Sequence, residues 1–164
     1  MGVLRAKTGV PFDLPTEAQW EYACRAGTTG AWNNGTTITN TIRDGNLNIL
    51  GRYWYNGGSM YLSDPVNGAH TTVGSYQANN WGLYDMHGNV WEWCLDWYAG
   101  SYGGDETDPT GPAAGSIRVF RSSSWGACYD SQAAMYCRSA SRSGVNADFA
   151  NFALGFRPAL AAGQ

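Results

Sequence analysis

Charged side chains and histidines are scarce in this chain, which limits the functions that it can have. Only 14% of its 164 residues are Asp, Glu, Lys or Arg, the net charge is −3, and there are two histidines. The basic residues form no cluster, so we expect no nucleic-acid partner, because phosphate binding needs concentrated positive charge. No apolar run reaches the roughly 20 residues of a membrane helix, and the first residues lack the apolar centre of a signal peptide. We therefore expect no membrane span, and the composition indicates no cell location.

Cysteine pairs are also absent. The four cysteines are scattered and none belongs to a CxxC motif: Cys24, Cys94, Cys128 and Cys137. A zinc site would need closer spacing or more histidine than the chain provides. We predict free or buried thiols, with disulfides as the alternative.

Glycine and tryptophan, in contrast, are abundant. The chain has 22 glycines and 8 tryptophans. Glycine at this frequency opposes long helices, whereas a few large aromatic side chains can bury much apolar surface. We expect one domain over residues 1–164, rich in loops, with short strands held together by aromatic side chains.

One helix is predicted, and it begins after Thr16. Thr16 and Gln19 have the spacing of a capping box, in which each side chain accepts from the other residue's backbone N–H. Trp20 and Cys24 then lie one turn apart and form a buried stripe. Gly27 is expected to end this helix.

The remaining elements are predicted to be short strands joined by irregular segments. Residues 28–74 are polar and rich in glycine, which indicates a long irregular connection. Strands are predicted at residues 73–76, 117–121, 135–138 and 154–157.

Residues 81–97 combine a turn with a strand of two different faces. In a strand, successive side chains point to opposite faces. One face would carry Trp91, Trp93 and Trp97, and the other would carry Val90, Glu92 and Cys94. If the chain doubles back before the strand, the carboxylates of Asp85 and Glu92 converge with backbone carbonyls into a site for Ca2+. The alternative is that Asp85 caps the turn and Glu92 pairs with an arginine.

Six motifs occur in order along the chain. They are Leu14-Pro-Thr-Glu-Ala-Gln-Trp-Glu-Tyr-Ala, Gly82-Leu-Tyr-Asp-Met-His-Gly-Asn-Val-Trp-Glu-Trp, Asp108-Pro-Thr-Gly-Pro, Arg118-Val-Phe-Arg, Cys137-Arg-Ser-Ala and Gly155-Phe-Arg. Through them the chain resembles the formylglycine-generating-enzyme (sulfatase-modifying factor) domain family from about Thr8 to Leu160. The resemblance implies an α+β, C-type lectin-like fold, loop-rich with short antiparallel strands and few helices. The portion that usually precedes the first motif in this family is missing here.

The resemblance also implies structural Ca2+ at the second motif. The matching ligands are the side chains of Asp85 and Glu92 and the backbone carbonyls of Gly88 and Val90. In this interpretation the alternating tryptophans belong to the core.

The catalytic residues of the family do not match this chain. The oxidase holds copper with two cysteines five residues apart after a Gly-Gly-Ser-aromatic motif, whereas here Ser122-Ser-Ser-Trp is followed by Cys128 alone. Cys137 matches a structural cysteine instead. The iron-dependent relatives need a histidine cluster, which two histidines cannot supply. We therefore expect no enzymatic activity, with an oxidase acting on a peptide cysteine as the alternative.

A third kind of relative fits better, namely the variable proteins of diversity-generating retroelements, whose C-terminal segment is diversified at adenines. Residues 126–153 are then a variable ligand-binding surface, in which aromatic residues give rigid contact area and small residues adapt. The predicted binding residues are Tyr129, Asp130, Ser131, Ala133, Tyr136, Ser141, Ser143, Val145, Asn146, Ala147, Phe149, Ala150 and Phe152. The expected partner is a protein or another surface macromolecule. The sequence does not decide whether the protein is displayed on a phage or on a cell. A purely structural module is a further alternative to the binding function.

Overall fold

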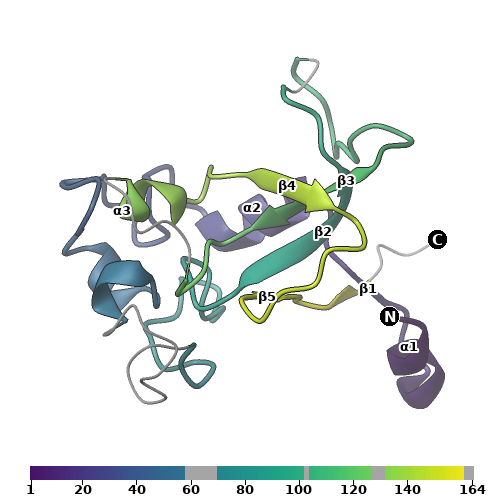
Figure 1. Cartoon of the computed structure of the whole chain (residues 1–164), viewed down its shortest axis with the longest axis horizontal. Helices are drawn as coiled ribbons and strands as arrows, with labels where there is room; N and C mark the ends of the chain where they lie inside the picture. The colour runs from purple at the N-terminus through teal and green to yellow at the C-terminus, as the bar shows by residue number, and fades with distance from the viewer. Residues whose placement is uncertain (58–69, 102–103, 127–131, 161–164) are drawn as a thin grey trace.

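A four-stranded sheet forms the centre of the molecule (Figure 1). The computed structural model describes residues 1–57, 70–101, 104–126 and 132–160. The strands are β2 (Trp91–Trp97), β3 (Ile117–Arg121), β4 (Ser143–Asn146) and β5 (Leu154–Gly155), in the order β4-β3-β2-β5. β2, β3 and β4 pair antiparallel, whereas β5 runs parallel to β2. A second sheet pairs β1 (Phe12–Asp13) with β6 (Ala159–Leu160), so the two ends of the described chain meet.

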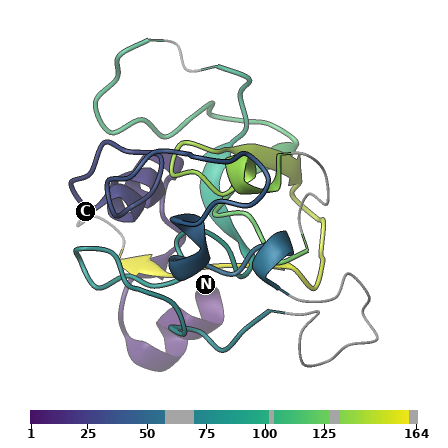
Figure 2. The ribbon, with the colours of Figure 1, turned by 90° about the vertical axis from the view of Figure 1, so that its left-hand side faces the viewer.

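The helices are short, and the mixed α+β class is confirmed. They are α1 (Gly2–Thr8), α2 (Glu17–Arg25), α3 (Ala133–Tyr136) and the 3₁₀ helices η1 (Leu47–Ile49) and η2 (Trp54–Asn56). Among the described residues, no helix has the length and apolar character needed to cross a membrane. Figure 2 looks onto the end formed by α3 and the 3₁₀ helices, and it shows the connection between β2 and β3 arching away from the body.

α2 begins as predicted. The Thr16 side chain accepts from the Gln19 backbone N–H at 3.1 Å, and the Gln19 side chain accepts from the Thr16 N–H at 2.9 Å. The helix ends at Arg25, and the residue that caps it is Ala26, with a left-handed φ of 46°, one position before the predicted Gly27. α1 was not predicted, and it buries none of its residues.

Two of the predicted strands are wrong and one is shorter than expected. Residues 73–76 form a turn, in which Gly74 has a positive φ of 75°. Residues 135–138 lie at the end of α3 and beyond, because Ala133 and Ala134 pack a helical turn into the core beside Trp32. A short apolar run does not distinguish a strand from a buried helical turn. Of residues 154–157, only Leu154–Gly155 is strand.

The core consists of two clusters. One joins α2 to the sheet through Trp20, Cys24, Met86, Cys94 and Val119. The other packs the irregular segment against α3, and its members are Trp32, Leu47, Leu50, Tyr53, Ala133, Ala134 and Cys137. Cys24, Cys94 and Cys137 are buried thiols outside any disulfide, as predicted, and Cys128 lies outside the described residues.

The prediction that the tryptophans of β2 belong to the core is wrong. Glu92, Cys94 and Asp96 point into the protein, whereas Trp91, Trp93 and Trp97 are half-buried on the other face. Polar groups can occupy the inner face because they are paired there. The backbone N–H of Glu17 donates to Asp96 at 2.7 Å, and Trp20 Nε1 donates to Glu92 at 2.7 Å.

A buried ionic network completes this inner face. Arg121 and Glu17 are almost without exposed surface and their side chains meet at 2.9 Å. Arg142 reaches the other oxygen of Glu17 at 2.6 Å, and Glu21 binds Arg121 at 2.6 Å. The network therefore ties α2 to β3 and to the segment that leads into β4.

Candidate functional site

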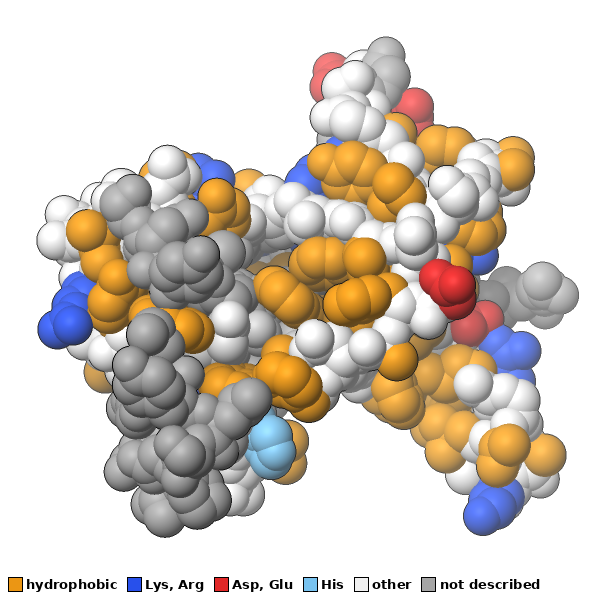
Figure 3. All heavy atoms as spheres, viewed as in Figure 1, with side chains coloured by type: hydrophobic (Ala, Val, Ile, Leu, Met, Phe, Trp, Pro, Cys, Tyr) orange, Lys and Arg blue, Asp and Glu red, His pale blue; other side chains and the backbone are white. Residues whose placement is uncertain are grey.

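No helix of the described residues packs against one face of the central sheet. α2 contacts β2 and β3 on the opposite face, through Trp20 and Glu17. The register aligns Phe120 with both Trp93 and Ser143, and it aligns Arg118 with both Trp97 and Val145. All six side chains therefore belong to the same face. Figure 3 shows apolar side chains gathered over this face of the sheet, which we call the open aromatic face.

The rings of the open aromatic face contact one another. The Phe120 ring lies 4.9 Å from the Trp91 ring and 6.3 Å from the Trp93 ring, measured between centroids. The Arg118 guanidinium lies 3.5 Å from the centre of the Trp97 ring. Such contacts join the side chains into one continuous platform with apolar and cation–π character.

A pocket of about 290 Å³ borders this platform. Its lining residues are Trp91, Phe120, Arg121, Ser123, Tyr136, Ser141, Arg142 and Ser143. Both arginines bind the buried Glu17 carboxylate. The pocket therefore offers aromatic surface and hydroxyl groups to a ligand, while its positive charge is already compensated.

Most of the predicted binding residues that the structure describes are accessible. Exposed are Tyr136, Ser143, Asn146, Ala147, Phe149, Ala150 and Phe152, and half-exposed are Ser141 and Val145. Ala133 is a correction, because it is 2% exposed and packs in the core. Tyr129, Asp130 and Ser131 lie outside the described residues.

The structure brings these accessible residues beside aromatic residues that the sequence reasoning did not assign to the site. Tyr136, Ser141 and Ser143 share the pocket with Trp91 and Phe120. The alternation in residues 91–97 was a signal for two faces, but it carried no information on which face is buried. That information came only from the partners of Glu92 and Asp96.

The segment between β4 and β5 is anchored at its end. The Phe152 ring packs against Trp125 with centroids 5.6 Å apart, although Phe152 is 64% exposed. The backbone N–H of Trp91 donates to the Ala153 carbonyl at 2.8 Å. Phe149 and Phe152 are therefore presented by a segment that is joined to the edge of the sheet.

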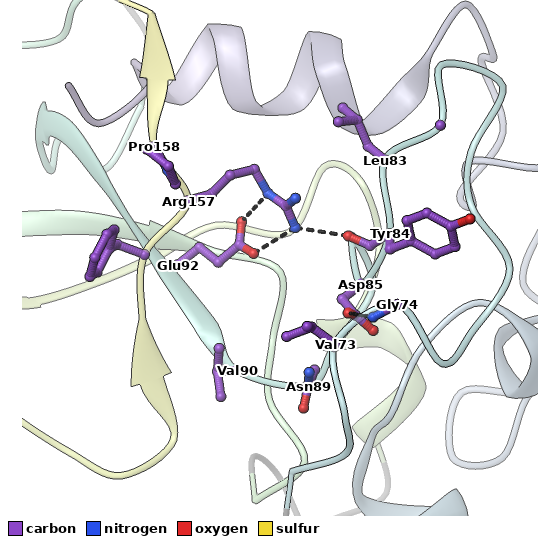
Figure 4. Close-up of a pocket in the computed structure, with 13 residues that line it drawn as sticks. Val73, Gly74, Leu83, Tyr84, Asp85, Asn89, Val90, Glu92, Arg157 and Pro158 are labelled. Atoms are coloured by element: carbon purple, nitrogen blue, oxygen red, sulfur yellow. Dashed lines mark hydrogen bonds and ion pairs between the residues drawn. The ribbon is translucent and has the colours of Figure 1, made fainter. Parts of the chain in front are cut away.

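The four predicted calcium ligands also lie together. Asp85, Gly88, Val90 and Glu92 line one pocket of about 490 Å³ (Figure 4). Asp85 Oδ2 accepts from the Gly74 N–H at 2.8 Å, whereas its Oδ1 is buried without a hydrogen-bond partner. An unpaired buried carboxylate oxygen is costly, and a bound cation would satisfy it.

Glu92 has the partner that the alternative to calcium predicts. Figure 4 shows Arg157 directed at Glu92, and Arg157 Nη2 lies 2.8 Å from Glu92 Oε1. The same nitrogen donates to the Tyr84 carbonyl at 2.8 Å. Among the described residues, no group of three or more His, Cys, Asp or Glu side chains could hold a metal ion. Of the four predicted ligands, Asp85 has an unpartnered oxygen, whereas Glu92 is paired with Arg157 and the Gly88 carbonyl accepts from Ser122 Oγ at 3.1 Å.

The thiols of Cys24 and Cys94 and the imidazole of His87 are buried in the core. Burial raises the pKa of Cys24 to about 12 and raises the pKa of Cys94 well above its usual value. Burial lowers the pKa of His87 to about 4. A buried protonated thiol is a poor nucleophile and a poor metal ligand.

Known proteins resemble this chain over almost its whole length. The profile of the sulfatase-modifying factor enzyme 1-like domain family matches residues 4–162. The formylglycine-generating enzyme of Streptomyces coelicolor is 39% identical over 151 residues, which are 88% of this chain and 45% of that protein. The mouse inactive C-alpha-formylglycine-generating enzyme 2 is 32% identical over 154 residues, 92% of this chain and 44% of that protein. The chain thus spans less than half the length of these relatives.

Two solved structures share the fold. Treponema denticola variable protein 1 superposes with a TM-score of 0.72 and 36% identity, over 91% of this chain and 47% of the other. PvdO from Pseudomonas aeruginosa gives a TM-score of 0.71 and 26% identity, over 96% and 55%. These likenesses confirm the predicted fold type.

Proposed function

Since this chain belongs to the sulfatase-modifying factor enzyme 1-like domain family, we propose that it is a member without catalytic activity that binds a ligand. In this proposal it is a variable protein of a diversity-generating retroelement. Its binding surface is the open aromatic face together with the accessible residues of the 126–153 segment.

The observation that carries the proposal is the register of β4 against β3. It aligns Ser143 with Phe120 and Val145 with Arg118. Two of the predicted variable positions, Ser143 and Val145, thereby lie beside Phe120 and Arg118 on the open aromatic face. The likeness to Treponema denticola variable protein 1 supports the same function.

The chemistry of this face favours a macromolecular partner. Aromatic rings and small hydroxyl side chains dominate it, as they dominate antibody paratopes. Such a surface suits a broad contact with a protein or another surface macromolecule, in which a few rings provide most of the affinity.

The first test asks whether the proposed binding surface tolerates substitution without a loss of stability. Ser143, Val145, Phe149 and Asn146 are replaced in combination, and the free energy of unfolding is measured by urea denaturation. A display surface predicts a change within about 0.5 kcal/mol for each position. The matched control replaces Trp91 and Phe120 by Ala, which removes the ring contacts of the platform and is expected to cost about 3 kcal/mol or more each.

The coding DNA gives a second, independent test. A diversified protein predicts a near-repeat of its 126–153 region whose differences are confined to adenines, beside a reverse transcriptase gene. Large losses of stability in the multiple variants, or the absence of any such repeat, would contradict the proposal.

Calcium is part of the proposal. We propose that Asp85, Glu92 and the carbonyls of Gly88 and Val90 hold one Ca2+ ion with a structural role. The unpartnered Asp85 Oδ1 supports this site. The ion would supply positive charge to two buried carboxylates and hold the turn before β2 against the segment at Gly74.

A formylglycine-generating or related oxidase is the second candidate. The 39% identity to the Streptomyces coelicolor enzyme favours it. It predicts copper binding at Cys128 and oxygen-dependent conversion of a peptide cysteine. The assay compares the copper-treated protein with Cys128→Ala on a cysteine-containing peptide. Activity that disappears in the variant supports the oxidase, whereas equal turnover by both proteins excludes this mechanism.

A further inference from the structure

The outer face of α2 carries an apolar surface that the proposed binding function does not use. The inner face of this helix buries Glu17, Trp20 and Cys24. On its outer side Tyr22 is 69% exposed, and its ring packs against the 48% exposed Trp81 with centroids 4.9 Å apart. Two aromatic rings, Tyr22 from α2 and Trp81 from the segment before β2, thus stand together in solvent beside the outer side of the helix.

Two hollows meet along this helix. The larger, of about 920 Å³, has an apolar wall that includes Leu14, Leu95 and Leu160. The smaller, of about 420 Å³, lies between α2 and residues 104–109. Ala18 and Tyr22 line both hollows. They therefore form one continuous groove over the helix, which we call the α2 groove.

The charge along the α2 groove is negative. Asp105, Glu106 and Asp108 lie on its rim, are exposed, and form no ion pair with any residue of the described ranges. The basic residues near it are already paired, since Arg25 binds Glu21 and Arg5 binds Asp13. Like-charge repulsion therefore disfavours anionic lipids and nucleic acids as occupants.

We propose that the α2 groove docks a basic amphipathic segment of a partner protein. Apolar side chains of that segment would contact Tyr22, Leu95 and Leu160, and its Lys or Arg side chains would face the three rim carboxylates. Peptide segments that lie in grooves in this way are recognised by regularly spaced apolar anchors, while complementary charge adds specificity and speeds association.

The position of the groove allows simultaneous binding at both surfaces. α2 lies behind the sheet when the open aromatic face is viewed from the front (Figure 1). A partner in the α2 groove would leave that face free. The groove therefore provides a way to attach the domain to another protein without covering its ligand-binding surface, and the inference stands even if the proposed function fails.

The first test measures binding of a labelled model peptide by fluorescence anisotropy. The probe is a helical peptide of about 14 residues made of Leu and Lys in amphipathic order, and its control has Glu in place of Lys. The complete chain is expected to bind the Lys peptide, more weakly as salt is raised, and not the Glu peptide. No binding of the Lys peptide, or equal binding of both peptides, would overturn the proposal.

Variants locate the site. The triple substitution Asp105→Asn, Glu106→Gln and Asp108→Asn is expected to weaken binding of the Lys peptide about tenfold, which is about 1.4 kcal/mol. Asn suits position 108, where the backbone φ is 48°. The matched control is Asp148→Asn, an exposed carboxylate between β4 and β5. Equal weakening by the control would show that general charge, and not this groove, attracts the peptide.

A second pair of variants tests the apolar contacts. Tyr22→Ala removes an exposed ring and is expected to weaken peptide binding without unfolding the protein, whereas Ile49→Ala, at a 52% exposed position elsewhere, leaves binding unchanged. If Tyr22→Ala binds the Lys peptide like the unmodified chain, the peptide does not lie in the α2 groove.

Discussion

At the scale of single residues, Glu17 connects the most distant parts of the chain. Its carboxylate is 1% exposed and receives Arg121 at 2.9 Å and Arg142 at 2.6 Å. Buried ionic groups are tolerated only while each charge keeps its partners. No local sequence pattern indicates these partners, because both arginines are more than a hundred residues away from Glu17 in the sequence.

This geometry predicts a large effect of one small substitution. Glu17→Gln keeps the size of the side chain but removes the charge, so Arg121 loses a buried partner and retains Glu21. We expect the free energy of unfolding to fall by about 3 kcal/mol, measured by urea denaturation. The control Glu106→Gln changes an exposed carboxylate and should stay within about 0.5 kcal/mol of the unmodified chain. Equal stability of the two variants would contradict the role of the network.

At the scale of elements, α2 could be predicted and α3 could not. The start of α2 depends on Thr16 and Gln19, which are neighbours in sequence. α3 depends instead on contacts of Ala133 and Ala134 with a core cluster built by residues 32–53. β2 was located correctly, but the identity of its buried face depended on α2 and β3.

The capping box gives a prediction for α2. Thr16→Ala removes the oxygen that accepts from the Gln19 N–H, and we expect a loss of about 1 kcal/mol in the free energy of unfolding. Thr16→Ser keeps an acceptor and should retain most of that stability. Urea denaturation of both variants measures the difference, and a cost shared equally by Ser and Ala would mean that the hydroxyl does not cap the helix.

At the scale of the whole molecule, the calcium proposal predicts a stability that depends on the ion. A ligand that binds only the folded state stabilises it by about 2.7 kcal/mol at a free concentration of 100 times its Kd. CaCl2 should therefore raise the unfolding midpoint, and Asp85→Asn should abolish the increase because it removes the unpartnered carboxylate oxygen. The control is Asp148→Asn, which changes an exposed carboxylate far from Asp85 in the sequence. An unfolding midpoint that stays the same with and without CaCl2 would exclude a structural calcium ion.

The two surfaces of the molecule also belong to this scale. The open aromatic face and the α2 groove lie on opposite sides of the central sheet. Their separation is a property of the assembled fold, because α2 packs against only one face of β2 and β3.

The sequence by itself determined the family, the α+β class, the start of α2 and the location of β2 and β3. Each of these depends on ordered motifs or on residues within a few positions of one another. It also identified Asp85 and Glu92 as a pair that shares one pocket. Only the tertiary structure decided which face of β2 is buried and which partner Glu92 has. Those outcomes depend on Glu17, Arg121 and Arg157, which approach β2 from distant segments. An alternating pattern defines two faces of a strand. Which of the two faces is buried depends on the elements that pack against the strand.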